Sequence, residues 1–131
     1  MADFGGMDLY RTVSKPGQPL QVENLGAPVN TEFDDACPGI SPDGHTLVFY
    51  SAPQRAGVKG GAKLFICFDS GHGGWTTPVS MGEGFNSPGA DYGATFSQDG
   101  RVLFFFRFDG KHCDAYWVST TALERFRELS H

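Results

Sequence analysis

The stretch Ser41-Pro-Asp-Gly-His-Thr-Leu-Val-Phe49 returns 56 residues later as Ser97-Gln-Asp-Gly-Arg-Val-Leu-Phe-Phe105. Both copies belong to a longer repeat, in which eight of the 24 positions from Gly26 to Phe49 are identical to the residue 56 positions further on. A third part of the unit appears as Asp8-Leu-Tyr10, Lys63-Leu-Phe65 and Asp114-Ala-Tyr116. A fixed period of this length indicates an array of supersecondary units, each too small to bury its own apolar face.

Within one unit the sequence predicts four short antiparallel strands. Runs rich in β-forming residues, at 36–41, 46–51, 63–68 and 75–81, are separated by polar or glycine-rich turns. Pro78 marks the fourth run as an edge strand, because proline cannot donate to a β-ladder. The second copy repeats the first three strands at 92–97, 101–106 and 115–119, and two strands at 8–13 and 20–25 precede the complete unit. A helix is expected at residues 121–129, with Thr120 or Thr121 as its N-cap.

Four antiparallel strands per repeat are typical of a propeller blade. The turns Ile40-Ser-Pro-Asp-Gly44 and Phe96-Ser-Gln-Asp-Gly100, each followed by an aliphatic and aromatic strand, resemble the WD40-like repeats of the TolB type, called PD40 repeats. The connector beginning at Trp75-x-x-Pro78 and the ending Asp114-Ala-Tyr-Trp-Val118 are similar to segments of that family. The resemblance implies a β-propeller fold and a broad role in protein association, and it implies no reaction.

The fold class we predict is all-β: a partial β-propeller of about two and a half four-stranded antiparallel blades, with a short C-terminal helix. One repeat domain spans residues 1–131, divided into an outer half-blade (1–30), a complete blade (31–85) and a last blade with the helix (86–131). Propellers have at least four blades, so nine strands cannot close the circle. We therefore expect completion by oligomerisation, or by the missing blades of a partner or of a longer chain.

Charge and composition exclude several classes of partner. The net charge is −5, which argues against nucleic acid and against anionic membrane surfaces. The first residues contain no basic segment followed by an apolar one, so no signal peptide is predicted and the chain as given reads as cytoplasmic, although relatives of this repeat type are often periplasmic. The three cysteines form no C-x-x-C pair, and they are expected to be reduced and mostly buried.

The turn residues are predicted to be structural, because they recur at the same phase of both copies. A catalytic site is needed once, whereas a turn that forms the fold is needed in every blade. Asp43 and Asp99 should accept backbone N–H bonds that close their turns. The structural set is Ser41, Asp43, Gly44, Ser97, Asp99 and Gly100.

Polar residues in the connectors give a candidate ligand site. Asn30 with Asp35, and Asn86 with Asp91, enter the predicted innermost strands, where they would either pin neighbouring blades together or contact a ligand at the axial rim. The predicted rim set is Asn30, Asp35, Arg55, Asn86, Asp91 and His112. No catalytic residue, metal ligand set or cofactor is predicted, since His112 beside Cys113 lacks a third orienting group.

The aromatic residues have two readings. Trp75, Trp117, Tyr92, Tyr116 and the strand Leu103–Phe106 would either form a stacking platform for sugars or bases, or fill the space between blades. We expect packing between blades. The predicted oligomer contacts are Leu9, Tyr10, Val22, Tyr116 and Trp117, which lie in the incomplete units at the two ends.

Two functions follow. The first is a non-catalytic propeller-type module for protein interaction and self-assembly, in which two or three chains close a ring head to tail. The alternative is a small-molecule- or carbohydrate-binding propeller with an axial site, where glycoside hydrolysis would use Asp35 and Asp91 as paired carboxylates. The sequence favours a protein that is not an enzyme.

Overall fold

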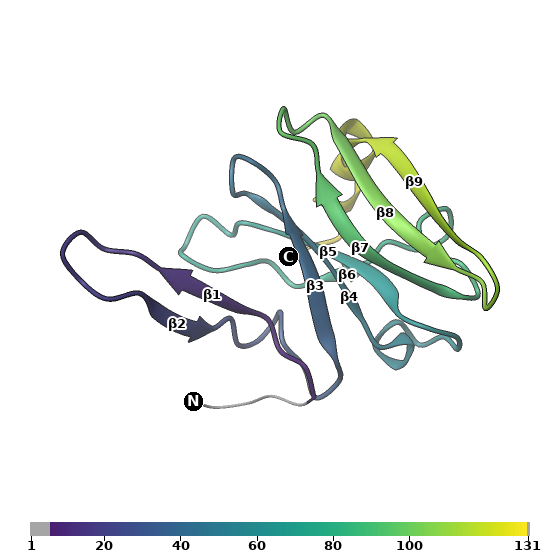
Figure 1. Ribbon diagram of the computed structural model, residues 1–131, viewed down its shortest axis with the longest axis horizontal. Coiled ribbons are helices and arrows are strands. Elements are labelled where there is room, and N and C mark those ends of the chain that lie inside the picture. The colour runs from purple at the N-terminus through teal and green to yellow at the C-terminus, as the bar shows by residue number, and fades with distance from the viewer. Residues whose placement is uncertain (1–5, 131) are drawn as a thin grey trace.

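A computed structural model describes residues 6–130 and contains three antiparallel sheets joined in series (Figure 1). A two-stranded hairpin is followed by a four-stranded sheet of order β3-β4-β5-β6 and a three-stranded sheet of order β7-β8-β9. The elements are β1 (Tyr10–Val13), β2 (Gln21–Asn24), β3 (Asp35–Ile40), β4 (Thr46–Ser51), η1 (Pro53–Ala56), β5 (Lys63–Phe68), β6 (Val79–Ser80), β7 (Ala90–Phe96), β8 (Val102–Phe108), β9 (Cys113–Ser119) and η2 (Thr120–Phe126). The all-β fold class is confirmed.

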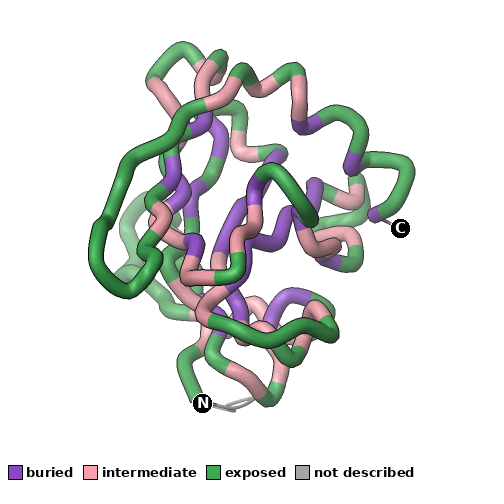
Figure 2. Tube along the Cα trace, turned by 90° about the vertical axis from the view of Figure 1, so that its right-hand side faces the viewer, coloured by how far each residue is buried: buried purple, intermediate pink, exposed green. Residues whose placement is uncertain are grey.

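The sheets pack against one another in the order of the chain, as propeller blades do. One apolar cluster lies between the β3–β6 sheet and the β7–β9 sheet, and it includes Val48, Ile66 and Leu103. A second cluster lies between the hairpin and the other face of the β3–β6 sheet, and it includes Leu9 and Phe49. Buried residues gather along the middle of the trace (Figure 2). The arrangement is a partial propeller with one complete blade between two incomplete ones.

The sequence repeat is also a repeat of hydrogen bonds. Asn30 accepts from the backbone N of Leu9 (2.7 Å) and donates to its carbonyl, while Asn86 makes the same two bonds with Leu64. Leu9, which directly precedes β1, therefore corresponds to Leu64 in β5. The hairpin β1–β2 is therefore the counterpart of β5–β6.

The predicted bounds hold for β4 and β5 and differ elsewhere. The fourth strand, predicted at 75–81, is reduced to Val79–Ser80, preceded by an isolated bridge between Asp69 and Trp75. Pro78 has no N–H to continue a ladder, which explains the short strand. A 3-10 helix at Pro53–Ala56 lies where a loop is predicted, with proline at its start and Gly57 in the left-handed conformation at its end.

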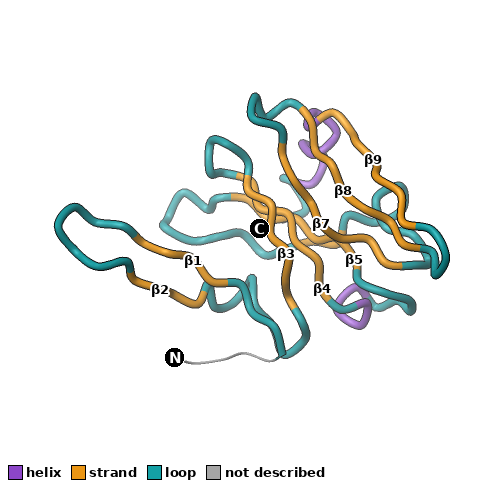
Figure 3. The backbone as a smooth tube through the Cα atoms, viewed as in Figure 1, coloured by secondary structure: helices purple, strands orange, loops and turns teal. Residues whose placement is uncertain are grey.

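The C-terminal helix is shorter than predicted and is a 3-10 helix, Thr120–Phe126 (Figure 3). Its N-cap is Ser119, whose hydroxyl accepts from the backbone N of Thr121, so the prediction of Thr120 or Thr121 is wrong. Leu123 and Phe126 are buried against the β7–β9 side of the core. The first and last predicted units, 1–30 and 86–131, extend at residues 1–5 and 131 outside the described residues. Within residues 6–130, no helix is long and apolar enough to cross a membrane.

Candidate functional site

Asp35 lies at the start of β3 and has no exposed surface. Its Oδ2 accepts from the backbone N (2.7 Å) and hydroxyl (2.8 Å) of Thr31, and its Oδ1 accepts from the hydroxyl of Ser51. Arg55, projecting from η1, forms an ion pair with the same Oδ1 at 2.9 Å. The charge of this carboxylate is therefore compensated by groups of the same chain.

Arg55 is fixed by more than its ion pair. It donates to the carbonyls of Val29 (2.8 Å) and Pro28 (2.9 Å), and its guanidinium lies 4.9 Å from the ring centroid of Phe65. Burial lowers the pKa of Arg55, and the neighbouring Asp35 opposes that shift. The residue holds the connector before β3 against the β4–β5 strands.

Asp91 is the counterpart of Asp35 and is equally buried. Its Oδ2 accepts from the backbone N (2.6 Å) and hydroxyl (2.9 Å) of Ser87, in the way that Thr31 serves Asp35. Its Oδ1 accepts from Nε of Arg107 at 2.7 Å. Arg107 comes from β8, at the repeat position of Ser51, so the arginine reaches the second carboxylate from a different segment.

Lys63 is a buried cation that the sequence did not single out. Its side chain is buried, and Nζ donates to the carbonyl of Gly89 at 2.5 Å, which ties β5 to the connector before β7. Burial lowers the pKa of Lys63, opposed by the charge of Asp91. The signal in the sequence was weak, because a lysine at the start of a strand is normally exposed.

The predicted rim set does not converge on one point. Asp35 and Arg55 contact each other, Asn30 and Asn86 bond to backbone of the preceding unit, and Asp91 is paired with Arg107. His112 lies in the exposed loop between β8 and β9, where its backbone N donates to Asp109. Asp35 and Asp91 present no exposed carboxylate to a substrate, so nothing in their geometry favours glycoside hydrolysis.

The two Ser-x-Asp-Gly turns have matching geometry. Ser41 donates its hydroxyl to Asp43 (2.5 Å), and Asp43 accepts from the backbone N of His45 (3.0 Å). Ser97 and Asp99 repeat the pattern at 2.7 Å, with Arg101 as the backbone donor at 3.0 Å. Gly44 and Gly100 both have positive φ, at 79° and 73°, which glycine adopts without strain. These residues close the two hairpins.

The outer face of the β7–β9 sheet carries exposed aromatic residues. Phe104, Phe106 and Phe108 alternate along β8, each 42% exposed, and Trp117 on β9 is 71% exposed. The register places Trp117 beside Phe104, and the ring of Tyr92 stacks on that of Phe106 at 6.2 Å. We call this surface, made of Tyr92, Phe104, Phe106, Phe108 and Trp117, the aromatic face.

The five predicted oligomer contacts lie in different places. Leu9 is buried in the chain's own core, while Tyr10 and Val22 are exposed on the hairpin. Tyr116 and Trp117 point to opposite sides of β9, because Tyr116 stacks on the buried Phe105. Only Trp117 belongs to the aromatic face. The alternation of Phe104, Phe106 and Phe108 was the signal for this face that the sequence reasoning passed over.

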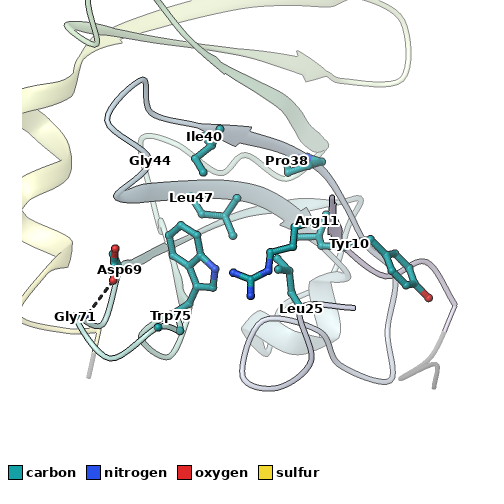
Figure 4. Close-up of a pocket in the computed structure, with 13 residues that line it drawn as sticks. Tyr10, Arg11, Leu25, Pro38, Ile40, Gly44, Leu47, Asp69, Gly71 and Trp75 are labelled. Carbon is teal, nitrogen blue, oxygen red and sulfur yellow. Dashed lines mark hydrogen bonds between the residues drawn. The ribbon is translucent and has the colours of Figure 1, made fainter. Parts of the chain in front are cut away.

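A groove of about 610 Å³ lies on the other side of the molecule, between the hairpin and the β3–β4 strands (Figure 4). Ile40, Leu47 and Trp75 form its apolar wall, and Arg11 projects beside Trp75. Arg11 is held by an ion pair with Glu23 at 2.9 Å. In the repeat, this is where the two inner strands of a preceding blade would lie.

The described part of the chain contains no assembled site for metal binding or thiol chemistry. Residues 6–130 contain no group of three or more His, Cys, Asp or Glu side chains placed to hold a metal ion. Cys67 is buried, and burial raises the pKa of its thiol to about 12. Cys37 and Cys113 are exposed, contrary to the expectation that the cysteines are mostly buried.

Comparisons with known proteins include a structural likeness. No family model matches the chain, and no curated protein matches it significantly. The crystal structure of TolB from Acinetobacter baumannii is similar over 91% of this chain, with 19% sequence identity and a TM-score of 0.46. The chain spans only 29% of the length of that TolB chain. Membership of the PD40 family stays a prediction, and the partial propeller rests on the order and packing of the sheets.

Proposed function

We propose that this chain is a non-catalytic protein-interaction module of the propeller type, which self-associates through its aromatic face. The observation that carries the proposal is the exposure of the aromatic pair Phe104 and Trp117, at 42% and 71%. Soluble proteins seldom leave a contiguous apolar patch of this kind open unless it is a contact surface.

The internal packing of the chain supports a sheet as the missing partner. Val48 and Ile66 hold in the β3–β6 sheet the positions that Phe104 and Trp117 hold in the β7–β9 sheet, paired across neighbouring strands in the same way. Val48 and Ile66 are fully buried, because the next sheet covers them. The same face of the last sheet has no following sheet among the described residues.

A ring of two or three chains is one way to supply that cover. Head-to-tail contact would set the aromatic face of one copy over the groove of the next, where Ile40 is 53% exposed. The missing blades of a partner protein would serve the same purpose. Both versions keep the chain a structural module without a reaction.

The test is molar mass in solution, measured by light scattering over a range of protein concentrations. We expect the wild-type mass to rise above 14.2 kDa with concentration, and Phe104→Ser to shift that rise to about tenfold higher concentration or more. Leu129→Ser is the matched control, since Leu129 is 65% exposed but lies beyond η2, away from the aromatic face. A wild-type mass that stays at 14.2 kDa at every concentration contradicts the proposal.

A further inference from the structure

This inference rests on the proposed self-association. The positions of β1 and β9 in the repeat limit the ways in which two copies can pack together. Asn30 and Asn86 equate β1 with β5, because they hold Leu9 and Leu64 by the same bonds. The pairing of β8 with β9 matches that of β4 with β5, which equates β9 with β5 as well. Strands β1 and β9 therefore hold the same position in their blades.

Head-to-tail contact in the register of the internal packing would bring these two strands into conflict. The last sheet of one copy, placed over the groove of the next, would set its β9 where the second copy already has β1. The second copy's β1 is anchored there by bonds of 2.7 and 2.8 Å between Asn30 and the backbone of Leu9. It also carries Arg11, a charged residue, where β9 carries Trp117.

The aromatic face can instead meet its own copy without displacing any strand. The register places only uncharged residues on this side of the sheet, so two such faces meet without opposing like charges. They are Ala90, Tyr92, Thr95, Val102, Phe104, Phe106, Phe108, Cys113, Ala115, Trp117 and Ser119. The Phe106 side chain is held in place, because its ring stacks on that of Tyr92. The same ring packs closely over Gly93, where an added Cβ would lie 2.8 Å from a carbon of the Phe106 ring.

We propose that the partner of the aromatic face is the aromatic face of a second copy, related by a two-fold axis. Sheets pack face to face about 10 Å apart in sandwiches, and flat aromatic rings from both sides fill that space. The symmetric pair closes at two chains. The groove beside Ile40 takes no part in it.

The size of the face sets the strength of the pair. Three strands about 4.8 Å apart and about 24 Å long offer roughly 300 Å² of flat sheet per copy before side-chain relief is counted. Roughly 600 Å² for the two copies together is below the roughly 1,000 Å² of a stable interface, so the dimer is expected to be weak and to dissociate on dilution. Its stability should depend on few residues, with the exposed pair Trp117 and Phe104 contributing most.

The experiment is sedimentation velocity on wild type, Phe104→Ser and Ile40→Ser, each over a concentration series. Ile40→Ser is the groove-side match, because Ile40 is comparably exposed. We expect wild type and Ile40→Ser to approach twice 14.2 kDa with similar midpoints. Phe104→Ser should weaken dimerisation about tenfold or more. Circular dichroism confirms that each variant is folded, and Trp117→Ser replaces Phe104→Ser if the latter is not.

An equimolar mixture of the two serine variants separates the arrangements. In head-to-tail contact both variants would be monomeric alone, and the mixture would regain a dimer from one intact face and one intact groove. That result, or a wild-type mass that plateaus at three chains, overturns the two-fold pair and leaves the proposed function standing. A monomer for wild type at every concentration overturns both.

Discussion

Asp35 and Asp91 occupy the same place in the repeat, yet each is paired with an arginine from a different segment. Arg55 reaches Asp35 from η1, whereas Arg107 reaches Asp91 from within β8. In both units a buried carboxylate accepts two hydrogen bonds from one residue of the connector. Thr31 donates both bonds to Asp35, and Ser87 donates both to Asp91. The connector before the first strand of each blade is shaped around that carboxylate.

Replacing Asp91 with alanine should destabilise the fold strongly, because it leaves Arg107 without its partner and the Ser87 backbone N–H without an acceptor. Removing one partner of a buried ion pair costs about 3 kcal/mol or more. The free energy of unfolding in urea measures the loss. Asp34→Ala is the control, since Asp34 is exposed and accepts one bond, from the backbone N of Met7. Equal losses for the two variants would contradict the structural role of Asp91.

The turn aspartates should make stability depend on pH in acid. Hydrogen bonds from Ser41 and from the backbone of His45 lower the pKa of Asp43 below 3.8, and Ser97 and Arg101 do the same for Asp99. A carboxyl whose pKa is lower in the folded than in the unfolded chain stabilises the fold at pH values above its unfolded-state pKa. That contribution is lost as the pH falls through the folded-state pKa. Urea midpoints measured above and below pH 3.8 should fall less steeply for Asp43→Asn/Asp99→Asn than for wild type. Identical slopes would count against these bonds.

At the scale of elements, the first strand of each blade carries a bulge with one residue in the left-handed region. The register shifts between Ala36 and Gly39 in β3, and between Tyr92 and Thr95 in β7. Gly93 has φ 70° in the second bulge, but the same position in the first is Cys37, with φ 51°. A side chain in this conformation is strained, and the strand tolerates it because the bulge is fixed by its neighbours.

Cys37→Gly should therefore stabilise the protein, because it relieves the strain at a cost in chain entropy. The expected net gain is about 1 kcal/mol. The reverse change, Gly93→Ala, should destabilise it, since a Cβ there would lie 2.8 Å from the Phe106 ring. Thermal melts of both variants check the pair. A lower melting temperature for Cys37→Gly would show that the position is not strained.

The sequence predicted the buried strands best. The bounds of β4 and β5 were correct, because each has an uninterrupted run of apolar and aromatic residues in its interior and is bounded by loops or turns on each side. Polar and short elements were harder: η1 depends on the αL conformation of Gly57 after a single helical turn, and the cap of η2 falls one residue earlier than the threonines suggested. Such ends are set by single hydrogen bonds, which periodicity does not report.

At the scale of the whole molecule, the repeat identified the number and order of the blades but not the surfaces left at the ends. Asp35 and Asp91 lie within the first strands β3 and β7, and the pairing of Asp91 with Arg107 and of Asn86 with the backbone of Leu64 could not be read from spacing. The phenylalanines of β8 are residues of the kind that pack between blades. Their exposure follows only from the absence of a covering sheet among residues 6–130.

Self-association should also appear as thermal stability that depends on concentration. A partner that binds only the folded state stabilises it in proportion to its free concentration relative to Kd. The melting temperature of wild type should therefore rise with protein concentration, while that of Trp117→Ser should stay constant. A constant value for both proteins would speak against coupling between folding and assembly.

The most direct test of the central claim, that the aromatic face of the last sheet is a contact surface, is nuclear magnetic resonance of the isotope-labelled chain at increasing concentration. The account predicts that the chemical shifts that change with concentration belong to residues of β8 and β9. The change at the indole N–H of Trp117 should be among the largest. The indole of Trp75, in the groove on the other side, should stay unchanged. Shifts that move around Trp75 while Trp117 stays constant, or no change over the whole range, would contradict it.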